Sequence, residues 1–156
     1  MTTSPPSTSS LDWRTQPFDQ LSTAELYAIL QLRASVFVVE QQCAYQDVDG
    51  KDLLAHHLTA WDGAQLAACA RLLPPGVSFP QVSIGRVVTA PRWRGTGLGR
   101  LLMARSVDMC AQLYGAQPIQ IGAQAHLKSF YGGLGFVPVS EDYLEDGIAH
   151  VDMVRP

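Results

Sequence analysis

The segment 92–99, RWRGTGLG, has the residue types of an anion-binding loop and runs directly into an apolar helical pattern. Its alternating glycines leave backbone N–H groups unhindered, so that successive amides can curve around an anion. The N-terminus of the following helix adds partial positive charge, and Arg92 and Arg94 can pair with phosphate oxygens. The segment therefore predicts a site for a diphosphate-bearing ligand. Its alternative interpretation is a glycine turn that only packs a helix against a strand.

Two common nucleotide-binding motifs do not match this segment. A Rossmann fingerprint needs G-x-G-x-x-G and an acidic residue about 20 positions further on. Here the third glycine comes one residue early, and Ile119 stands twenty positions beyond Gly99. A Walker loop ends in Gly-Lys-Ser/Thr, whereas this helix begins GLGRLL. The prediction of a phosphate site thus depends on the backbone amides, the helix terminus and the arginines alone.

The composition is that of one ordinary folded domain. The chain has 156 residues, of which 47% are hydrophobic and 16% charged, enough for a real core. A net charge of −3 argues against general binding to nucleic acid. The three cysteines are isolated and form no metal or disulfide pattern. A Ser/Thr/Pro-rich tail over 1–10 has no signal-peptide character, and no apolar run reaches the ~18 residues of a membrane span. We therefore expect a cytoplasmic protein with its domain over 11–156.

The periodicity along the chain predicts a mixed α/β domain. Ser22 and Glu25 form a capping-box pattern before an apolar-periodic helix. VFVVE, residues 36–40, could extend that helix or begin an extended segment. The other expected elements are two strands at 56–61 and 64–73 joined around Asp62-Gly63, a strand at Val82–Thr89, a helix from about Leu98, a strand at Pro118–Gln124, a short helix within 126–136, and two strands at 136–139 and 148–154 around the acidic loop 140–147. The first half should be antiparallel.

Two motifs in this order resemble those of the GNAT acetyltransferase superfamily. Arg92-Trp93-Arg94-Gly95-Thr96-Gly97 is similar to its R/Q-x-x-G-x-G/A motif and follows a strand and a proline in GRVVTAP. PIQIGAQAHLKSFYGGLGF resembles its second signature, a strand and then a short helix with Phe-Tyr followed by Gly-Phe. The stretches LRASVFVVEQQCAYQDVDGKD, IGRVV, GAQAHLKSFY and EDGIAH are similar to the ElaA-type branch. The resemblance covers about residues 11–153.

The resemblance implies a fold and a cofactor site. The fold is a central mixed β-sheet with an antiparallel N-terminal half, flanked by helices, in which two splayed parallel strands bind acetyl-CoA. Those strands would be Val82–Thr89 and Pro118–Gln124, with the pantetheine arm bonded to the backbone of the first. Many members have Asn where Gln124 stands, so an asparagine contact is not expected. The implied cofactor-binding residues are Val87, Val88, Thr89, Arg92, Arg94, Gly95, Thr96, Gly97, Leu98, Gly99, Gln124 and Tyr131, with no metal.

The implied reaction is acetyl transfer to an amine by direct attack, which needs a neutral amine and a proton for the leaving thiolate. Tyr131 stands where the family places the general acid, although it could equally pack with Phe130 in the core. The general base is open among Glu40, His57 and His150. His150 should face away from the core because the last strand alternates. Arg33 and Arg86 lie in apolar elements and need partners, for which Glu40 is one candidate.

Two acidic stretches, 47–52 and 141–146, suggest that the acceptor is a cationic amine such as a polyamine, an amino sugar or a lysine-bearing peptide. A calcium loop is rejected because the twelfth position from Asp47 is Leu58 and not Glu. We expect no nucleic acid or membrane partner, and many members of the resembled family form homodimers. Two other hypotheses remain: a non-catalytic acyl-CoA-binding sensor, and an acyltransferase that makes a lactone signal, since LRASVF loosely resembles such enzymes.

Overall fold

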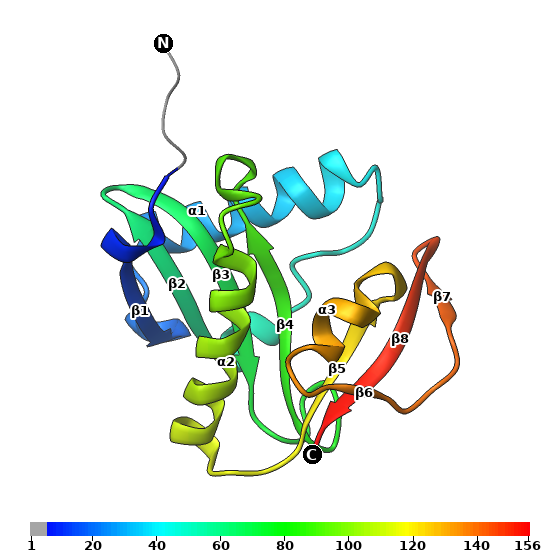
Figure 1. The fold of residues 1–156 in the computed structure, drawn as a ribbon. Helices are drawn as coiled ribbons and strands as arrows, with labels where there is room; N and C mark the ends of the chain where they lie inside the picture. Colours follow the sequence, from blue (N-terminus) through cyan, green and yellow to red (C-terminus); the bar gives the residue numbers. More distant parts are fainter. Residues whose placement is uncertain (1–5) are drawn as a thin grey trace.

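A computed structural model describes residues 6–156, and Figure 1 shows them as one mixed sheet with helices on both faces. Residues 1–5 of the expected tail lie outside the described residues, and Thr8–Ser10 form a short 3-10 turn. The eight strands are β1 Asp12–Pro17, β2 His56–Asp62, β3 Gln65–Leu73, β4 Val82–Thr89, β5 Ile119–Gln124, β6 Val137–Pro138, β7 Tyr143–Glu145 and β8 Ile148–Arg155. Their order in the sheet is β1-β2-β3-β4-β5-β8-β6, with β7 paired to β8.

The sheet divides where β4 meets β5. Strands β1 to β4 pair antiparallel, as predicted, and β5 pairs antiparallel with β8. The β4–β5 pair is parallel and holds only at Val82↔Ile119 and Ser83↔Gln120. Beyond these two rungs the strands diverge, so the edge of β4 that faces β5 has no strand partner. The expected fold class and the splayed parallel pair are confirmed.

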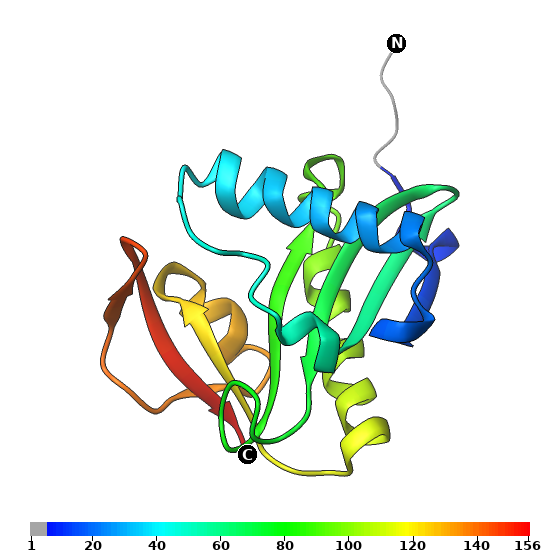
Figure 2. The same cartoon turned by 180° about the vertical axis from the view of Figure 1, so that it is seen from behind.

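Three helices cover the two faces of the sheet. Helix α1, Thr23–Arg33, packs on β3 and β4 on one face, whereas α2, Leu98–Tyr114, packs on the same two strands from the other. Figures 1 and 2 show this opposition from front and back. Helix α3, Lys128–Gly132, lies beside β5 on the α2 side. The main core fills the space between the sheet and α2, and a smaller cluster lies under α1.

The start of α1 follows from its sequence, and its end resolves an open question. The Ser22 hydroxyl accepts from the Glu25 amide at 3.0 Å, and the Glu25 carboxylate accepts from the Ser22 amide at 2.8 Å, which completes the predicted capping box. VFVVE continues the helix, because Ala34–Glu40 forms a π-helix after Arg33. π-helical turns are rare in proteins, and those that occur are often at functional sites.

A buried ion network fastens the loop 41–55 to the sheet. Arg33, whose side chain is 1% exposed, pairs with Asp47 at 3.0 Å and Asp52 at 2.7 Å. Arg71 of β3 contacts Asp49 at 2.8 Å and Asp52 at 3.2 Å. Arg86 of β4 pairs with Asp47 at 2.8 Å and Asp49 at 3.3 Å. The expectation that Glu40 pairs with Arg33 or Arg86 is therefore wrong, because aspartates of the loop 41–55 pair with Arg33 and Arg86 instead. Hydrogen-bonded partners are what make such buried charges tolerable.

Two strands were absent from the expected set. Strand β1, DWRTQP, alternates too weakly to be recognised, and its pairing with β2 is a long-range contact. Strand β7 lies inside the expected acidic loop and forms a hairpin with β8. Asp146 and Gly147 make its turn with φ values of 51° and 78°. Positive φ at both central residues is what a tight Asp-Gly hairpin requires, so that dipeptide was a usable signal.

Within residues 6–156, none of the helices combines the length and apolar character needed to cross a lipid bilayer.

Candidate functional site

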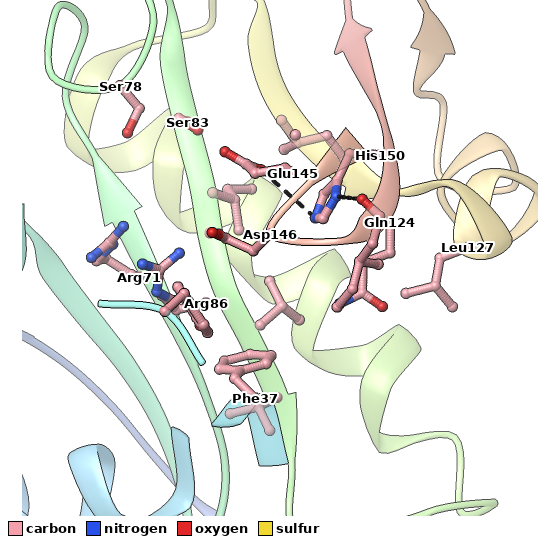
Figure 3. A pocket seen from close by; sticks show the side chains of 18 of the residues that line it. Phe37, Arg71, Ser78, Ser83, Arg86, Gln124, Leu127, Glu145, Asp146 and His150 are labelled. Carbon is pink, nitrogen blue, oxygen red and sulfur yellow. Dashed lines mark hydrogen bonds and ion pairs between the residues drawn. The ribbon is translucent and has the colours of Figure 1, made fainter. Parts of the chain in front are cut away.

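A cavity of about 950 Å³ opens where β4 and β5 diverge. Figure 3 shows side chains from both sides of β4 converging on it. Seven of the expected site residues line it: Val87, Val88, Thr89, Arg94, Gln124, Tyr131 and His150. Glu40, His57, Arg92 and the segment 95–99 do not contribute to this lining. The fold thus brings together most of the expected strand and acid positions but only one of the three candidate bases.

Strand β4 has a bulge at the cavity. Cys69 is opposite Val88, whereas Arg71 is opposite Gly85, so one extra residue lies on β4. Arg86 falls in this interval and adopts φ 48°, a conformation that is strained for a residue with a side chain. Bulges interrupt a ladder and redirect side chains. Together with the unpaired edge toward β5, the bulge leaves backbone groups of β4 suited to bonding an extended ligand chain.

The glycine loop has the backbone conformation that its sequence suggests. Gly95 and Gly97 have φ values of 76° and 84°, and Gly97 is the N-cap of α2 without any side-chain cap. The first amides of a helix have no acceptor within it, so the head of α2 offers donors to an anion. Two amides of the segment are already engaged: Arg94 donates to the Pro91 carbonyl at 3.2 Å, and Leu98 to the Thr96 hydroxyl at 3.4 Å.

Both loop arginines carry exposed ion pairs. Arg94 donates to both carboxylate oxygens of Glu40 at 2.6 and 2.8 Å, and each side chain is about half exposed. Arg92 pairs with Asp62 at 3.2 Å. Exposed pairs contribute little net stability, so a phosphate can compete for either arginine. The hydrogen bond from Arg94 lowers the pKa of Glu40, which makes Glu40 a weaker proton acceptor than an unpaired carboxylate.

Tyr131 packs in the core and also borders the cavity. Its ring is 8% exposed and packs edge-on against Phe130 at 5.1 Å and Phe136 at 6.0 Å. Its residue nevertheless lines the cavity. Burial raises the pKa of the phenol to about 12, because the phenolate loses solvation. The group therefore stays protonated through the neutral range.

The two candidate histidines differ in access. His57 is 2% exposed, and its Nε2 lies 3.0 Å from the Asp52 carbonyl. Burial lowers its pKa, and it does not line the cavity. His150 does, and it lies on β8 beside Gln124 (Figure 3). Its Nδ1 is 2.7 Å from the Ile148 carbonyl. A carbonyl only accepts, so Nδ1 carries the hydrogen and Nε2 of the neutral ring has a free lone pair.

The structure adds lining residues that the sequence interpretation did not single out. Gln124 donates to Gln41 at 3.1 Å, and Cys43 donates to the Asp146 carbonyl at 3.3 Å. These two contacts join the loop after the π-helix to the β5–β8 side of the cavity. Arg71 interrupts an apolar strand just as Arg86 does, so the same signal pointed to it. The side-chain pairing across the cavity had no signal in the sequence.

The two acidic stretches differ in how their charges are paired. Asp47, Asp49 and Asp52 contact arginines, so the first stretch is largely neutralised. Asp49 of the first stretch and Glu145 and Asp146 of the second stretch line the cavity. Both acidic loops therefore reach the cavity, but the carboxylates of the first are paired with arginines, whereas Glu145 and Asp146 have no arginine or lysine partner among the described residues.

Comparison with known proteins agrees with this geometry. A family profile described as an acetyltransferase (GNAT) domain matches residues 23–155. Protein ElaA of Escherichia coli strain K12 is 44% identical over 147 residues, covering 93% of this chain and 96% of ElaA. A crystal structure of an acyl-CoA N-acyltransferase from Pseudomonas aeruginosa is 51% identical with a TM-score of 0.90, over 94% of this chain and 100% of that one. The crystal structure of Escherichia coli ElaA is 42% identical with a TM-score of 0.88, over 94% and 99%. A matching profile, high identity over nearly full length and a shared fold make this chain a member of the GNAT acyltransferase family, of the ElaA type.

Proposed function

We propose that the protein transfers an acetyl group from acetyl-CoA to a primary amine by direct attack. The observation that supports this most is the cavity between β4 and β5, which joins an unpaired strand edge to a buried tyrosine and an accessible histidine. In the proposed complex the pantetheine arm bonds to the backbone of Val87, Val88 and Thr89. The diphosphate is held by the loop 94–99 and the head of α2, with Arg92 and Arg94 turning to it. Gln124 lies beside the thioester.

The proposed proton transfers use His150 and Tyr131. Nε2 of His150 takes a proton from the ammonium group, and the neutral amine attacks the thioester carbonyl. The C–S bond then breaks with its electron pair on sulfur, which takes the phenolic proton of Tyr131. The nitrogen of the new amide loses its second proton to solvent, and solvent restores the phenol of Tyr131 and deprotonates the imidazolium. Glu145, whose carboxylate is 3.8 Å from Nε2, stabilises the imidazolium. Between the candidate bases we prefer His150 to Glu40 because Glu40 is held by Arg94, and to His57 because His57 is buried away from the cavity.

Release of the CoA thiol across a panel of amines tests the function directly. We expect amine-dependent release with acetyl-CoA and a matching amount of N-acetylated product. An acyl-CoA-binding sensor would bind acetyl-CoA and release no thiol with any amine. An acyltransferase of the lactone-forming class would prefer a longer acyl chain, so the panel is repeated with butyryl- and hexanoyl-CoA. If turnover were faster with hexanoyl-CoA, a longer acyl-CoA would replace acetyl-CoA as the proposed donor.

The substitution His150→Gln should lower kcat/KM at neutral pH by about a hundredfold, the lower end of what a positioned base contributes. The loss should shrink as the pH approaches the pKa of the amine, because the acceptor then deprotonates without help. His56→Gln is the control, since His56 is half-buried and lies outside the cavity lining. If His150→Gln lowered kcat/KM by the same factor at every pH, so that its pH–rate profile ran parallel to that of the wild type, His150 would not be the base.

A further inference from the structure

The cavity has two walls of opposite charge on its acceptor side. Arg71, Arg86 and Lys51 line one wall together with Asp49, which pairs with both arginines. Glu145, Asp146 and Asp152 line the other wall with His150. Figure 3 shows Arg71 and Arg86 together on one side of β4, with Glu145, Asp146 and His150 across from them. We propose that the acceptor carries a carboxylate as well as the reacting amine, as an amino acid or the end of a peptide does. This inference rests on the proposed amine acetyltransferase.

Arg71 retains a donor pair with the shape that carboxylates prefer. Its side chain is 4% exposed, and its Nη1 donates to Asp49 at 2.8 Å and Asp52 at 3.2 Å. Nη2 donates to Asp49 at 3.1 Å. A guanidinium has five N–H groups, so one on Nη2 and the one on Nε remain. These two lie on the same side of the group. Nε has no acceptor among the described residues and is buried, so a ligand carboxylate would bond to it in two-pronged geometry once the Arg71 side chain turned toward the cavity that it lines.

The cationic wall also carries an excess of charge. Three arginines of the network, Arg33 included, are matched by the carboxylates of Asp47, Asp49 and Asp52. Lys51 is additional. Its Nζ donates to the Ser78 hydroxyl at 2.9 Å, and it has no ion pair within the described part of the chain. One positive charge therefore faces the cavity without a counter-charge, as an anionic ligand group requires.

The opposite wall suits an ammonium group. Glu145 and Asp146 come from the turn of the β7–β8 hairpin, and Asp152 accepts from the Tyr143 hydroxyl at 2.6 Å. Cationic residues are absent from the part of β7 and β8 that lines the cavity. A carboxylate bound by Arg71 and Lys51 would direct the amine of the same molecule toward these acids and His150.

Two simpler occupants fit the charges less well. A polyamine would bring a second ammonium against Lys51 and Arg86, where like charges repel. The coenzyme A phosphates belong to the loop after Thr89, at the end of β4, whereas Arg71 is opposite Gly85 near the middle of that strand. The cationic wall is therefore a second anion site, separate from the diphosphate loop.

The test compares amines that differ only in their carboxylate: lysine with lysine amide, and ornithine with ornithine amide, alongside cadaverine and putrescine. Thiol release gives kcat/KM, and calorimetry on the protein saturated with coenzyme A gives acceptor binding. We expect kcat/KM to be at least about tenfold higher for the carboxylates, as for loss of a charge-assisted hydrogen bond. Amidation lowers the pKa of the neighbouring α-amine, so more of that amine is neutral in the amide than in the free amino acid. This effect alone would make the amides better acceptors, and a preference for the carboxylates would therefore have to overcome it.

The wall itself is tested by Lys51→Glu and the milder Lys51→Gln. The preference for the carboxylate should disappear in Lys51→Glu and shrink in Lys51→Gln. Lys128→Glu is the matched control, because Lys128 is exposed, pairs with Asp142 at 3.2 Å and does not line the cavity. Thermal melts establish that each variant is folded.

The outcomes separate this inference from the proposed function. Equal values for the paired acceptors, or a preference for the diamines, would overturn the inference while acetyl transfer stands. If no amine releases thiol, catalysis fails, and binding decides: selective binding of the carboxylates by the wild type would support the second anion site, and equal or absent binding would overturn it.

Discussion

Replacing Tyr131 with phenylalanine is expected to lower kcat by about 10²–10⁴-fold, the usual contribution of a positioned acid, while the affinity for acetyl-CoA stays within experimental error. The substitution removes only the hydroxyl. The ring contacts with Phe130 and Phe136 remain, and among the described residues no hydrogen bond from that hydroxyl is lost. Stopped assays of thiol release give kcat, and calorimetry gives the affinity.

A phenol with a pKa near 12 can protonate the leaving group where binding also removes the sulfur from water. In bulk water a thiolate is a much weaker base than a phenolate. In this protein, burial raises the pKa of the Cys69 and Cys110 thiols to about 12, equal to the value for Tyr131. Desolvation of the leaving sulfur would likewise raise the basicity of the thiolate and narrow its difference from the phenolate. Activity should not fall through ionisation of Tyr131 until the pH approaches 12.

The matched control for this prediction is Tyr114→Phe. Burial also raises the pKa of Tyr114 to about 12, but its hydroxyl donates to the Leu72 carbonyl at 3.3 Å outside the cavity. We expect its turnover to be unchanged. If Tyr131→Phe retained wild-type kcat, the leaving thiolate would have to take its proton from elsewhere, and Tyr131 would be a packing residue.

The parts of the fold that could be predicted are those set by neighbouring residues. The capping box at Ser22 and Glu25 and the strand Val82–Thr89 depend on local patterns, and both are present. The glycine loop ahead of α2 is likewise local, since Gly95 and Gly97 need only their own positive φ. Strand β1 escaped prediction because its stabilising partner, β2, lies some forty residues away.

The site was harder to predict because its charges pair across the fold. An arginine within an apolar segment of the sequence indicates that a carboxylate must pair with it, but the sequence does not identify that carboxylate. In the structure Arg33 pairs with Asp47 and Asp52, and Glu40 pairs with Arg94. These ion pairs hold one candidate base, Glu40, against Arg94 and match the aspartates of the first acidic stretch with arginines. We prefer His150 as the base because its Nδ1 bonds to the carbonyl of Ile148, which fixes the tautomer with a free Nε2. That contact depends on the backbone geometry and could not be predicted from the residue types.

The substitution Gly97→Glu should reduce acetyl-CoA affinity by at least about a hundredfold. Gly97 is the N-cap of α2, has φ 84°, and has open space where a side chain would go. A glutamate there would place a carboxylate in the region proposed for the diphosphate, with like-charge repulsion and bulk acting together. Helix stability would not suffer from the charge, because an anion at a helix N-terminus is favourable. The left-handed backbone costs about 1–2 kcal/mol for a residue other than glycine.

Two further variants separate charge and strain from position. Gly97→Gln has nearly the same bulk and backbone strain, so the ratio of its affinity to that of Gly97→Glu gives the electrostatic part, which should decrease as salt is added. Gly115→Glu introduces the same side chain at the same φ of 84°, also into open space, but at the far end of α2. It should melt earlier than wild type and bind acetyl-CoA normally. Tight binding by folded Gly97→Glu would move the diphosphate away from the head of α2, and with it the direction in which the thioester enters the cavity.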